Sequence, residues 1–201
     1  MEDKLLEFYK NALLGTASDK PLCEAYKSEW RKCGDDKDKL MKLALRQQSL
    51  PYIFTYAHKG KGLTKDYLTS EFKDYINGGK TIYDADGVQG YTYQLNVDLQ
   101  KDWTITTDVA AFMYCKDTMV TIQTTKCPSI YIGCSSDVHL CLDGFNSIRV
   151  HIYDDSRVVI EDTDECSDVI VYRYSKDARV ECGKYCLCDV KEFEKDLKLQ
   201  L

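Results

Sequence analysis

Two hydrophobic periods divide the chain near residue 79. Before that point, apolar side chains recur at spacings of three and four residues, the period of a helix that buries one face. After it, apolar residues alternate with polar ones, the period of a strand. The sequence therefore predicts an α+β protein, with a helical domain over residues 1–79 and a β-repeat domain over residues 80–201.

The helical part contains five apolar stripes, each bounded by residues that start or stop helices. They run over residues 3–14, from Pro21 to Gly34, from Asp36 to Leu45, from Leu50 to Tyr56, and from Thr64 to Ile76. Asp36 and Thr64 are residue types that cap helix N-termini, and Pro51 suits a first helical turn. Five short helices in this span predict a compact helical bundle.

The β part is built on a unit that recurs about every ten residues. Each unit has a polar turn, usually with Ser or Asp, followed by an apolar residue, a spacer and a second apolar residue. The apolar pairs are Val120/Ile122, Ile130/Ile132, Leu140/Leu142, Val150/Ile152, Val158/Ile160, Val169/Val171 and Val180/Cys182. Self-similarity at a fixed period is the sequence signature of a repeat architecture.

Two architectures fit this spacing. In a β-solenoid each unit forms one face of a coil, whereas in an antiparallel sandwich or meander each unit is a strand of a hairpin. The units are short and alike, and most turns lack the Asn-Gly or Asp-Gly hairpin dipeptide, apart from Asp86-Gly87 and Asp143-Gly144. We therefore favour the solenoid, and we expect the amphipathic tail from Val190 to Leu197 to form a capping helix.

The alternation of the repeat fails at Val159 and Ile170, where both strand faces are apolar. Such a strand needs a cover, which could be the helical segment, the tail or another subunit. Outward tyrosines add aromatic surface of the kind that is enriched in protein interfaces. The candidate interaction surface is Val159, Ile170, Tyr172, Tyr131 and Tyr153.

Charge is divided unevenly between the two parts. The chain carries a net charge of −6, with a net charge of +2 on residues 1–79 and −8 on residues 80–201. An acidic β part should repel nucleic acid and anionic membranes, so we expect no direct binding to either. The candidate acidic face is Asp154, Asp155, Asp162 and Asp164.

Ten cysteines raise the question of metal or redox chemistry. The N-terminus is charged and amphipathic and does not resemble an export signal, which predicts a cytoplasmic location and reduced thiols. Cys182, Cys186 and Cys188 lack the paired spacing of a structural zinc site, and Cys182 falls at an inward repeat position. We therefore interpret the cysteines as buried apolar side chains and expect no metal and no cofactor.

Catalytic motifs are weak throughout. His139, His151 and Cys141 could lie near one another on an outward face, but they are placed as ordinary strand residues. The loop from Lys59 to Gly62 resembles a phosphate loop only in part, because it follows a helix instead of a strand. No apolar run approaches the roughly 20 residues that a membrane span needs. We expect a protein that is not an enzyme.

One stretch resembles a known group of proteins. Leu50-Pro51-Tyr52-Ile53, the Lys-Gly-x-Gly-Leu-Thr turn from Lys59 to Thr64, and Tyr75-Ile76-Asn77-Gly78 are similar to a motif of small uncharacterised proteins from gut Bacteroidales and their phages. In that group a helical segment precedes a β-repeat tail. The resemblance implies a phage or mobile-element setting, in the host cytoplasm or a virion, and it transfers no activity and no site residue.

These observations favour a non-enzymatic protein-interaction or structural protein that binds a protein partner or self-associates. A second hypothesis is an acidic decoy, in which regularly spaced carboxylates imitate a phosphate ladder and inhibit a host nucleic-acid-binding or defence protein. A third is a glycan-active β-helix enzyme that uses turn acids and tyrosines, although no pair of carboxylates with a catalytic signature supports it.

Overall fold

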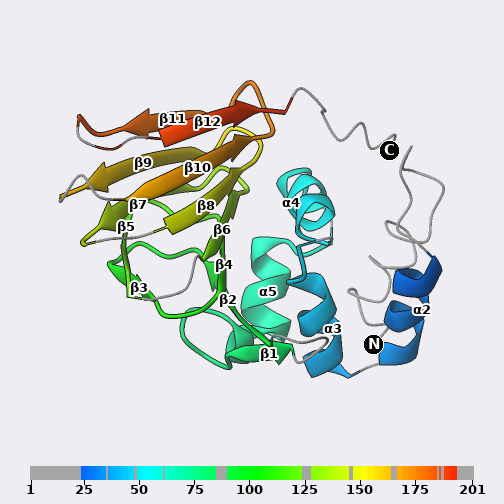
Figure 1. Ribbon diagram of the computed structural model, residues 1–201. Coiled ribbons are helices and arrows are strands. Elements are labelled where there is room, and N and C mark those ends of the chain that lie inside the picture. Colours follow the sequence, from blue (N-terminus) through cyan, green and yellow to red (C-terminus); the bar gives the residue numbers. More distant parts are fainter. Residues whose placement is uncertain are drawn as a thin grey trace.

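The computed structural model shows a two-sheet coil with helices along one side (Figure 1). It describes residues 24–34, 36–47, 49–60, 62–84, 90–123, 128–144, 147–163, 167–184, 186 and 188–193. The helix predicted over residues 3–14 lies outside the described residues. No helix in the described part of the chain has the length and apolar character needed to cross a membrane.

The strands form two sheets, and strands that follow one another along most of the coil alternate between them. The larger sheet has the order β1 (Ile82–Asp84), β2 (Tyr91–Val97), β4 (Val109–Met113), β6 (Ser129–Gly133), β8 (Ser147–Ile152), β10 (Asp168–Arg173) and β12 (Cys188–Glu192). The smaller sheet has the order β11 (Arg179–Cys182), β9 (Arg157–Asp162), β7 (Asp137–Leu142), β5 (Thr118–Ile122) and β3 (Trp103–Ile105). The protein is therefore a β-solenoid.

Strand pairing explains the ten-residue unit. Ile130 pairs with Val150 in one sheet and Leu140 pairs with Ile160 in the other, so one coil spans 20 residues and contains two units. Neighbouring strands are parallel throughout the described coil, apart from β1, which pairs antiparallel with β2. The prediction that each unit is one face of a coil is confirmed, and the antiparallel sandwich or meander is wrong.

The predicted inward residues fill the coil. Every predicted pair from Val120/Ile122 to Val169/Val171 is buried between the two sheets. The last pair keeps its register, since Cys182 lies beside Ile160, but Val180 is half-buried and Cys182 is exposed. The interpretation of Cys182 as a buried side chain is therefore wrong, because its strand belongs to the final rung.

Small buried residues stack at one corner of the coil, as expected for a narrow solenoid. The Cys115 amide donates to Ser136 Oγ at 3.1 Å, and the Ser136 amide donates to Ser156 Oγ at 3.1 Å. At this corner Tyr114, Ser135 and Asp154 have φ of 59°, 57° and 49°, so the chain turns there in the left-handed region. Serine hydroxyls thus accept hydrogen bonds from backbone amides that, at the corner, have no partner in either sheet.

The helices follow the predicted boundaries closely. They are α2 (Glu24–Cys33), α3 (Lys37–Ala44), α4 (Leu50–His58), α5 (Lys65–Glu71) and the 3-10 turn η2 (Lys73–Tyr75). Asp36 caps α3 by accepting from the Lys39 amide, and Thr64 caps α5 by accepting from the Tyr67 amide. The segment that the sequence assigns to one helix ending at Ile76 is divided between α5 and η2.

α3, α4 and α5 lie against the outer face of the seven-stranded sheet, and α2 packs on α3 (Figure 1). α3 contacts β1, α5 contacts β2 and α4 contacts β6. Their buried side chains form one core with the outward side chains of the sheet, among them Leu95, Ala111, Met113, Tyr131 and Tyr153. A second core, made of the inward side chains, fills the coil itself.

β1, β4 and β12 were not predicted from the sequence. β4 is buried at all five positions, because one face lines the coil and the other lies under the helices, and so it shows no alternation. β12 includes Val190 and Lys191, where the sequence predicts the start of a capping helix. That helix therefore does not start at Val190, and residues 194–201 lie outside the described residues.

Candidate functional site

Outward side chains of the seven-stranded sheet align in columns, because its parallel strands are in register. One column changes character along its length. It comprises Leu95, Ala111, Tyr131, His151, Tyr172 and Lys191, in order from β2 to β12. The column is thus aliphatic under the helices, aromatic in the middle and cationic at the last strand.

Aromatic rings stack across the strands at the C-terminal end of this face, forming what we call the aromatic strip. The ring centroids of Tyr131 and His151 are 4.4 Å apart, and those of His151 and Tyr172 are 4.8 Å apart. A second stack runs beside the first, with 4.7 Å between Tyr153 and Tyr174 and 5.3 Å between Tyr174 and Phe193. The strip comprises Tyr131, His151, Tyr172, Tyr153, Tyr174 and Phe193.

Burial keeps His151 uncharged. Desolvation, followed by the positive charge of Arg149, lowers the pKa of His151 to about 4, so its imidazole is neutral at neutral pH. Its Nδ1 lies 3.2 Å from the Tyr174 hydroxyl, and burial raises the pKa of Tyr174. Lys191 places its ammonium 5.9 Å from the centre of the Tyr172 ring, in the range of a cation–π contact.

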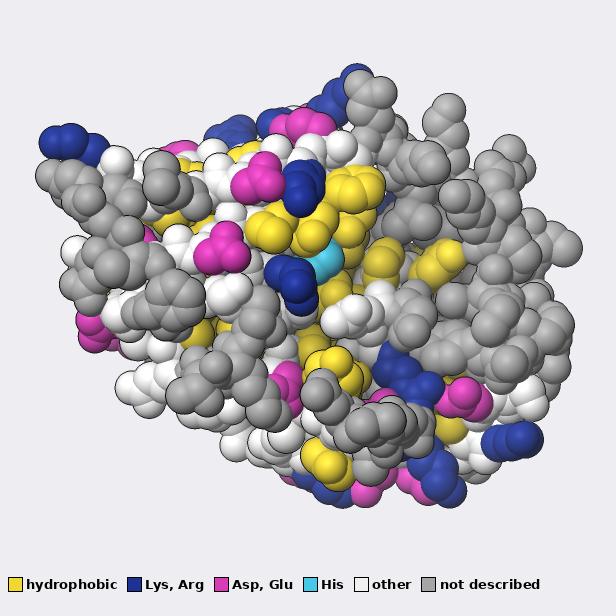
Figure 2. Space-filling view, viewed as in Figure 1, with side chains coloured by type: hydrophobic (Ala, Val, Ile, Leu, Met, Phe, Trp, Pro, Cys, Tyr) yellow, Lys and Arg dark blue, Asp and Glu magenta, His cyan; other side chains and the backbone are white. Residues whose placement is uncertain are grey.

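Exposure of the strip increases toward β12. Tyr131 and Tyr153 are buried beneath the helices, Tyr172 and Tyr174 are half-buried, and Phe193 is 42% exposed. Figure 2 shows this face, where hydrophobic side chains gather around a histidine and are flanked by lysine or arginine and by acidic side chains. The C-terminal part of the strip is therefore an accessible apolar and aromatic surface.

The same end exposes residues that belong to the interior of the coil. Val190 is in register with the buried Val171, yet it is 41% exposed. Among the described residues, β12 pairs with a strand on one side only, and the same holds for β11. Within the part of the chain that the structure describes, the final rung therefore leaves core positions exposed and strand edges unpaired, which repeat proteins ordinarily cover.

The predicted interaction residues do not form one patch. Tyr131, Tyr153, Ile170 and Tyr172 lie on the outer face of the seven-stranded sheet. Val159 lies on β9 in the other sheet, between His139 and Glu181. The structure thus brings four of the five residues together and separates Val159 from them.

The predicted acidic residues are also dispersed. Asp154 lies in the corner after β8 and is mostly buried, whereas Asp155 beside it is exposed. Asp162 ends β9, is buried, and accepts a hydrogen bond from the Ser167 amide at 2.9 Å. Asp164 lies outside the described residues. Two of these carboxylates therefore stabilise turns and are not available as a regular acidic ladder.

The cysteine and histidine candidates separate in a similar way. His139 and Cys141 lie on the same face of β7, but His151 lies on β8, which belongs to the other sheet, so the expected proximity of His139 and His151 is wrong. Cys186 Sγ and Cys188 Sγ are 3.3 Å apart at the final rung. Burial raises the pKa of both thiols, which favours their protonated forms.

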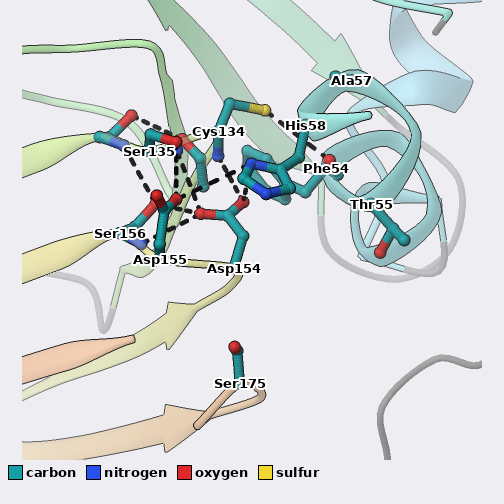
Figure 3. A network of polar contacts seen from close by, with 12 residues as sticks. Phe54, Thr55, Ala57, His58, Cys134, Ser135, Asp154, Asp155, Ser156 and Ser175 are labelled. Carbon is teal, nitrogen blue, oxygen red and sulfur yellow. Dashed lines mark hydrogen bonds and ion pairs between the residues drawn. The ribbon is translucent and has the colours of Figure 1, made fainter. Parts of the chain in front are cut away.

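A cluster that the sequence did not suggest lies where α4 meets the solenoid (Figure 3). His58 Nδ1 lies 3.8 Å from Asp154 Oδ2 and 3.8 Å from Asp155 Oδ1. Among the described residues, this is the group of histidine, cysteine and acidic side chains whose ligand atoms converge closely enough to hold a metal ion. Nothing in the sequence pattern relates residue 58 to residues 154 and 155, since only the folded coil brings α4 to this corner.

Hydrogen bonds hold both carboxylates in place. Asp154 accepts from the backbone amides of Cys134 at 2.6 Å and Ser135 at 3.1 Å, and from Ser156 Oγ at 2.7 Å. Asp155 accepts from Ser135 Oγ at 2.6 Å. Burial raises the pKa of Asp154, an effect that these hydrogen bonds oppose, whereas the hydrogen bond from Ser135 lowers the pKa of Asp155.

Comparisons with known proteins supply no further constraint on this surface or this cluster. No protein-family model matches the chain, no curated protein matches it, and no solved structure matches it.

Proposed function

We propose that this protein is a non-enzymatic interaction protein that self-associates through the C-terminal rung of its solenoid. The observation that carries the proposal is the exposure of Val190, a residue whose register places it in the core column of the coil. β12 also has an edge with no partner strand among the described residues, and an exposed core position beside such an edge favours the addition of another strand. The adjoining part of the aromatic strip, with Tyr172, Tyr174 and Phe193, supplies apolar area next to that edge.

The charge pattern of β12 favours a second copy as the occupant. If two β12 strands pair antiparallel with Val190 opposite Val190, each Asp189 lies opposite Lys191 of the other copy. Asp189 and Lys191 share the outer face of the strand, where their charged atoms are 3.4 Å apart within one chain. A two-fold axis through Val190 therefore creates two further opposite-charge pairs, and such an interface is self-complementary.

The alternative functions have less support. An acidic decoy rests on the net charge, because Asp154 and Asp162 are buried in turns. A glycan-active enzyme rests on the tyrosines, and those of the aromatic strip stack on one another or on His151, with 4.4 to 4.8 Å between ring centroids. The phage or mobile-element setting rests on the resemblance of residues 50–78 and agrees with either a structural or an interaction role.

Charge-swap variants test the proposal. Asp189→Lys or Lys191→Asp alone would place like charges opposite each other across the two-fold axis, so each should weaken the dimer at least tenfold. The double variant Asp189→Lys with Lys191→Asp restores opposite charges and should restore dimerisation. Sedimentation velocity of the full chain, over a range of concentrations, measures the dimer directly.

Two outcomes would overturn this proposal. A wild-type chain that stays monomeric up to about 1 mM would exclude self-association of useful strength. A dimer that all three variants leave unchanged would place the interface elsewhere. Circular dichroism of each variant checks that the solenoid still folds.

A further inference from the structure

The cluster at the junction of α4 and the solenoid suggests a second property of the protein, independent of self-association. We propose that His58, Asp154 and Asp155 bind one divalent transition-metal ion of the zinc and cobalt class, which joins the end of α4 to the corner after β8. His58 supplies Nδ1, Asp154 supplies Oδ2 and Asp155 supplies Oδ1 (Figure 3).

The distances between these three atoms suit ligands of a common ion. Nδ1 of His58 is 3.8 Å from each carboxylate oxygen, too far for a hydrogen bond. Ligands about 2.1 Å from a zinc-like ion lie about 3.0 to 4.2 Å from one another, depending on the angle between them. Both histidine distances fall within that range, and all three ligand atoms lie within 4.8 Å of one another, so a single ion can contact all three.

The charges at the cluster also favour a cation. Asp154 and Asp155 are adjacent carboxylates, and the side chain of Asp154 is only 8% exposed. Within the described residues, the ion pairs of both carboxylates are with His58, and no lysine or arginine approaches either of them closely enough to form one. A bound divalent ion would balance the two negative charges while the imidazole stays neutral, as a metal ligand must.

The surrounding hydrogen bonds give the carboxylates the orientation that a metal site requires. The Cys134 amide donates to Asp154 Oδ2 at 2.6 Å, and Ser135 Oγ donates to Asp155 Oδ1 at 2.6 Å, so the two proposed ligand oxygens are each held by one donor. Each oxygen keeps a second lone pair for the ion. Partners of this kind, beyond the direct ligands, orient the ligands and strengthen metal binding.

The ligand set selects the class of metal. One imidazole and two carboxylates suit zinc, cobalt or manganese better than calcium, which takes six to eight oxygens. His58 and Asp155 are partly exposed, with side-chain accessibilities of 38% and 55%, so water can complete the coordination. The site thus has three protein ligands and open positions toward solvent.

Titration of the full chain with Co²⁺ under reducing conditions tests the proposal. Cobalt reports its ligands optically, because thiolate ligands add a sulfur-to-metal charge-transfer band that nitrogen and oxygen ligands lack. We expect one equivalent to bind below about 0.1 mM, without that band and with displacement by Zn²⁺. His58→Gln and Asp155→Asn should each weaken binding more than tenfold, and Ser135→Ala about tenfold.

Matched control variants test whether other histidine or cysteine side chains bind the cobalt ion. His139→Gln removes a half-buried histidine on the opposite sheet and should leave cobalt binding unchanged. Cys182→Ser with Cys188→Ser removes two of the clustered thiols and should also leave it unchanged. Asp154→Asn is a poorer test, because Asp154 also stabilises the corner, and its result needs a check of folding.

Three results would overturn the proposal: no saturable binding at about 0.1 mM, equal affinity in His58→Gln, or a thiolate band that disappears in the cysteine variant. A loss of binding in His58→Gln counts as support only if the thermal midpoint of the metal-free variant matches that of the metal-free wild type. Because His58 is 38% exposed, we expect that match.

Discussion

The outer face of the seven-stranded sheet has a covered half, on β2, β4 and β6, and an open half, on β8, β10 and β12. Both halves continue the same side-chain columns in the same register. Where the helices approach β2 and β4, the outward column carries Leu95 and Ala111, and β6 adds the buried ring of Tyr131. The open half carries rings and charges. The repeat that builds the coil is shared, so the difference lies in the outward positions alone.

Gly133 illustrates what the covered half requires. A side chain at this position would place its Cβ 2.5 Å from the Phe54 ring of α4, so the helix can lie this close only because the residue is glycine. In the same column, the next outward residue is Tyr153, which stacks on Phe54 with 5.1 Å between the ring centroids. The Phe54 ring of α4 thus requires a glycine at one outward position and stacks on a tyrosine ring at the next.

The largest effect is expected at Phe54. Phe54→Ala removes a fully buried ring at the centre of the covered half and should lower the free energy of unfolding by about 4 kcal/mol. Tyr172→Ala, its counterpart on the open half, removes a half-buried ring and should cost about 1.5 kcal/mol or less. Guanidinium denaturation of both variants measures the contrast, and equal losses would contradict the assignment of covered and open halves.

Ion pairs should show the same contrast with a smaller magnitude. Asp84 is 5% exposed and pairs with Lys42 at 2.8 Å and Arg46 at 2.7 Å. Asp84→Asn leaves these cations without their buried partner and should cost about 3 kcal/mol. Glu192→Gln removes an exposed pair with Arg173 on the open half and should change stability by about 0.5 kcal/mol. Urea denaturation at low and moderate salt measures the free energy of unfolding of both variants. A loss for Glu192→Gln as large as that for Asp84→Asn would contradict the prediction.

Acid should destabilise the boundary between the halves through His151. Burial lowers its pKa from 6.5 to about 4 in the folded chain, so between these values the unfolded chain binds an additional proton. The neutral His151 side chain therefore contributes its full share of the free energy of unfolding above pH 6.5, and this contribution falls as the pH drops toward 4. Between pH 6.5 and pH 5 the loss should be about 2 kcal/mol.

His151→Phe keeps the ring stack and removes the titration. Its unfolding free energy should therefore change less than that of the wild type over the same pH interval. Parallel pH profiles, measured by denaturant unfolding, give the comparison, and identical slopes for the two proteins would show that His151 does not carry the effect.

The smallest effect is expected at the final rung. Val190→Thr adds a hydroxyl at a position that is 41% exposed and should change monomer stability by less than about 0.5 kcal/mol. Val150→Thr makes the same change two rungs earlier in the same inward column, where the residue is fully buried, and should cost about 2 kcal/mol. Thermal unfolding at low protein concentration separates these values, and a large loss at Val190 would mean that the end of the coil is covered.

Sequence pattern predicted the interior of the coil well, because inward positions depend only on alternation along a single strand. Val150 and Ile152 could be assigned inward without knowing which strand lies beside them. β4 escaped detection because it is buried on both faces and so has no alternation. β12 was not predicted because its charged residues, Asp189, Lys191 and Glu192, fit an amphipathic helix equally well. Only pairing with the neighbouring strand β10 makes this segment a strand.

Outward positions and the candidate sites were predicted less well. Val159 and Ile170 break the same alternation, yet they lie on different sheets, which a single period cannot reveal. The buried state of Asp154 depends on the amides of Cys134 and Ser135, one coil away. Such contacts come from residues that are adjacent through stacking and distant in the chain.

Local pattern specified the period, the inward columns, the helix caps at Asp36 and Thr64, and the division into helical and β parts, because each depends on neighbours within a few residues. Tertiary structure decided which half of the sheet the helices cover, which strand ends the coil, and how His58 reaches Asp154 and Asp155. Those outcomes depend on which surfaces pack best against each other. The segments that pack lie far apart in the chain, so local periodicity carries no information about them.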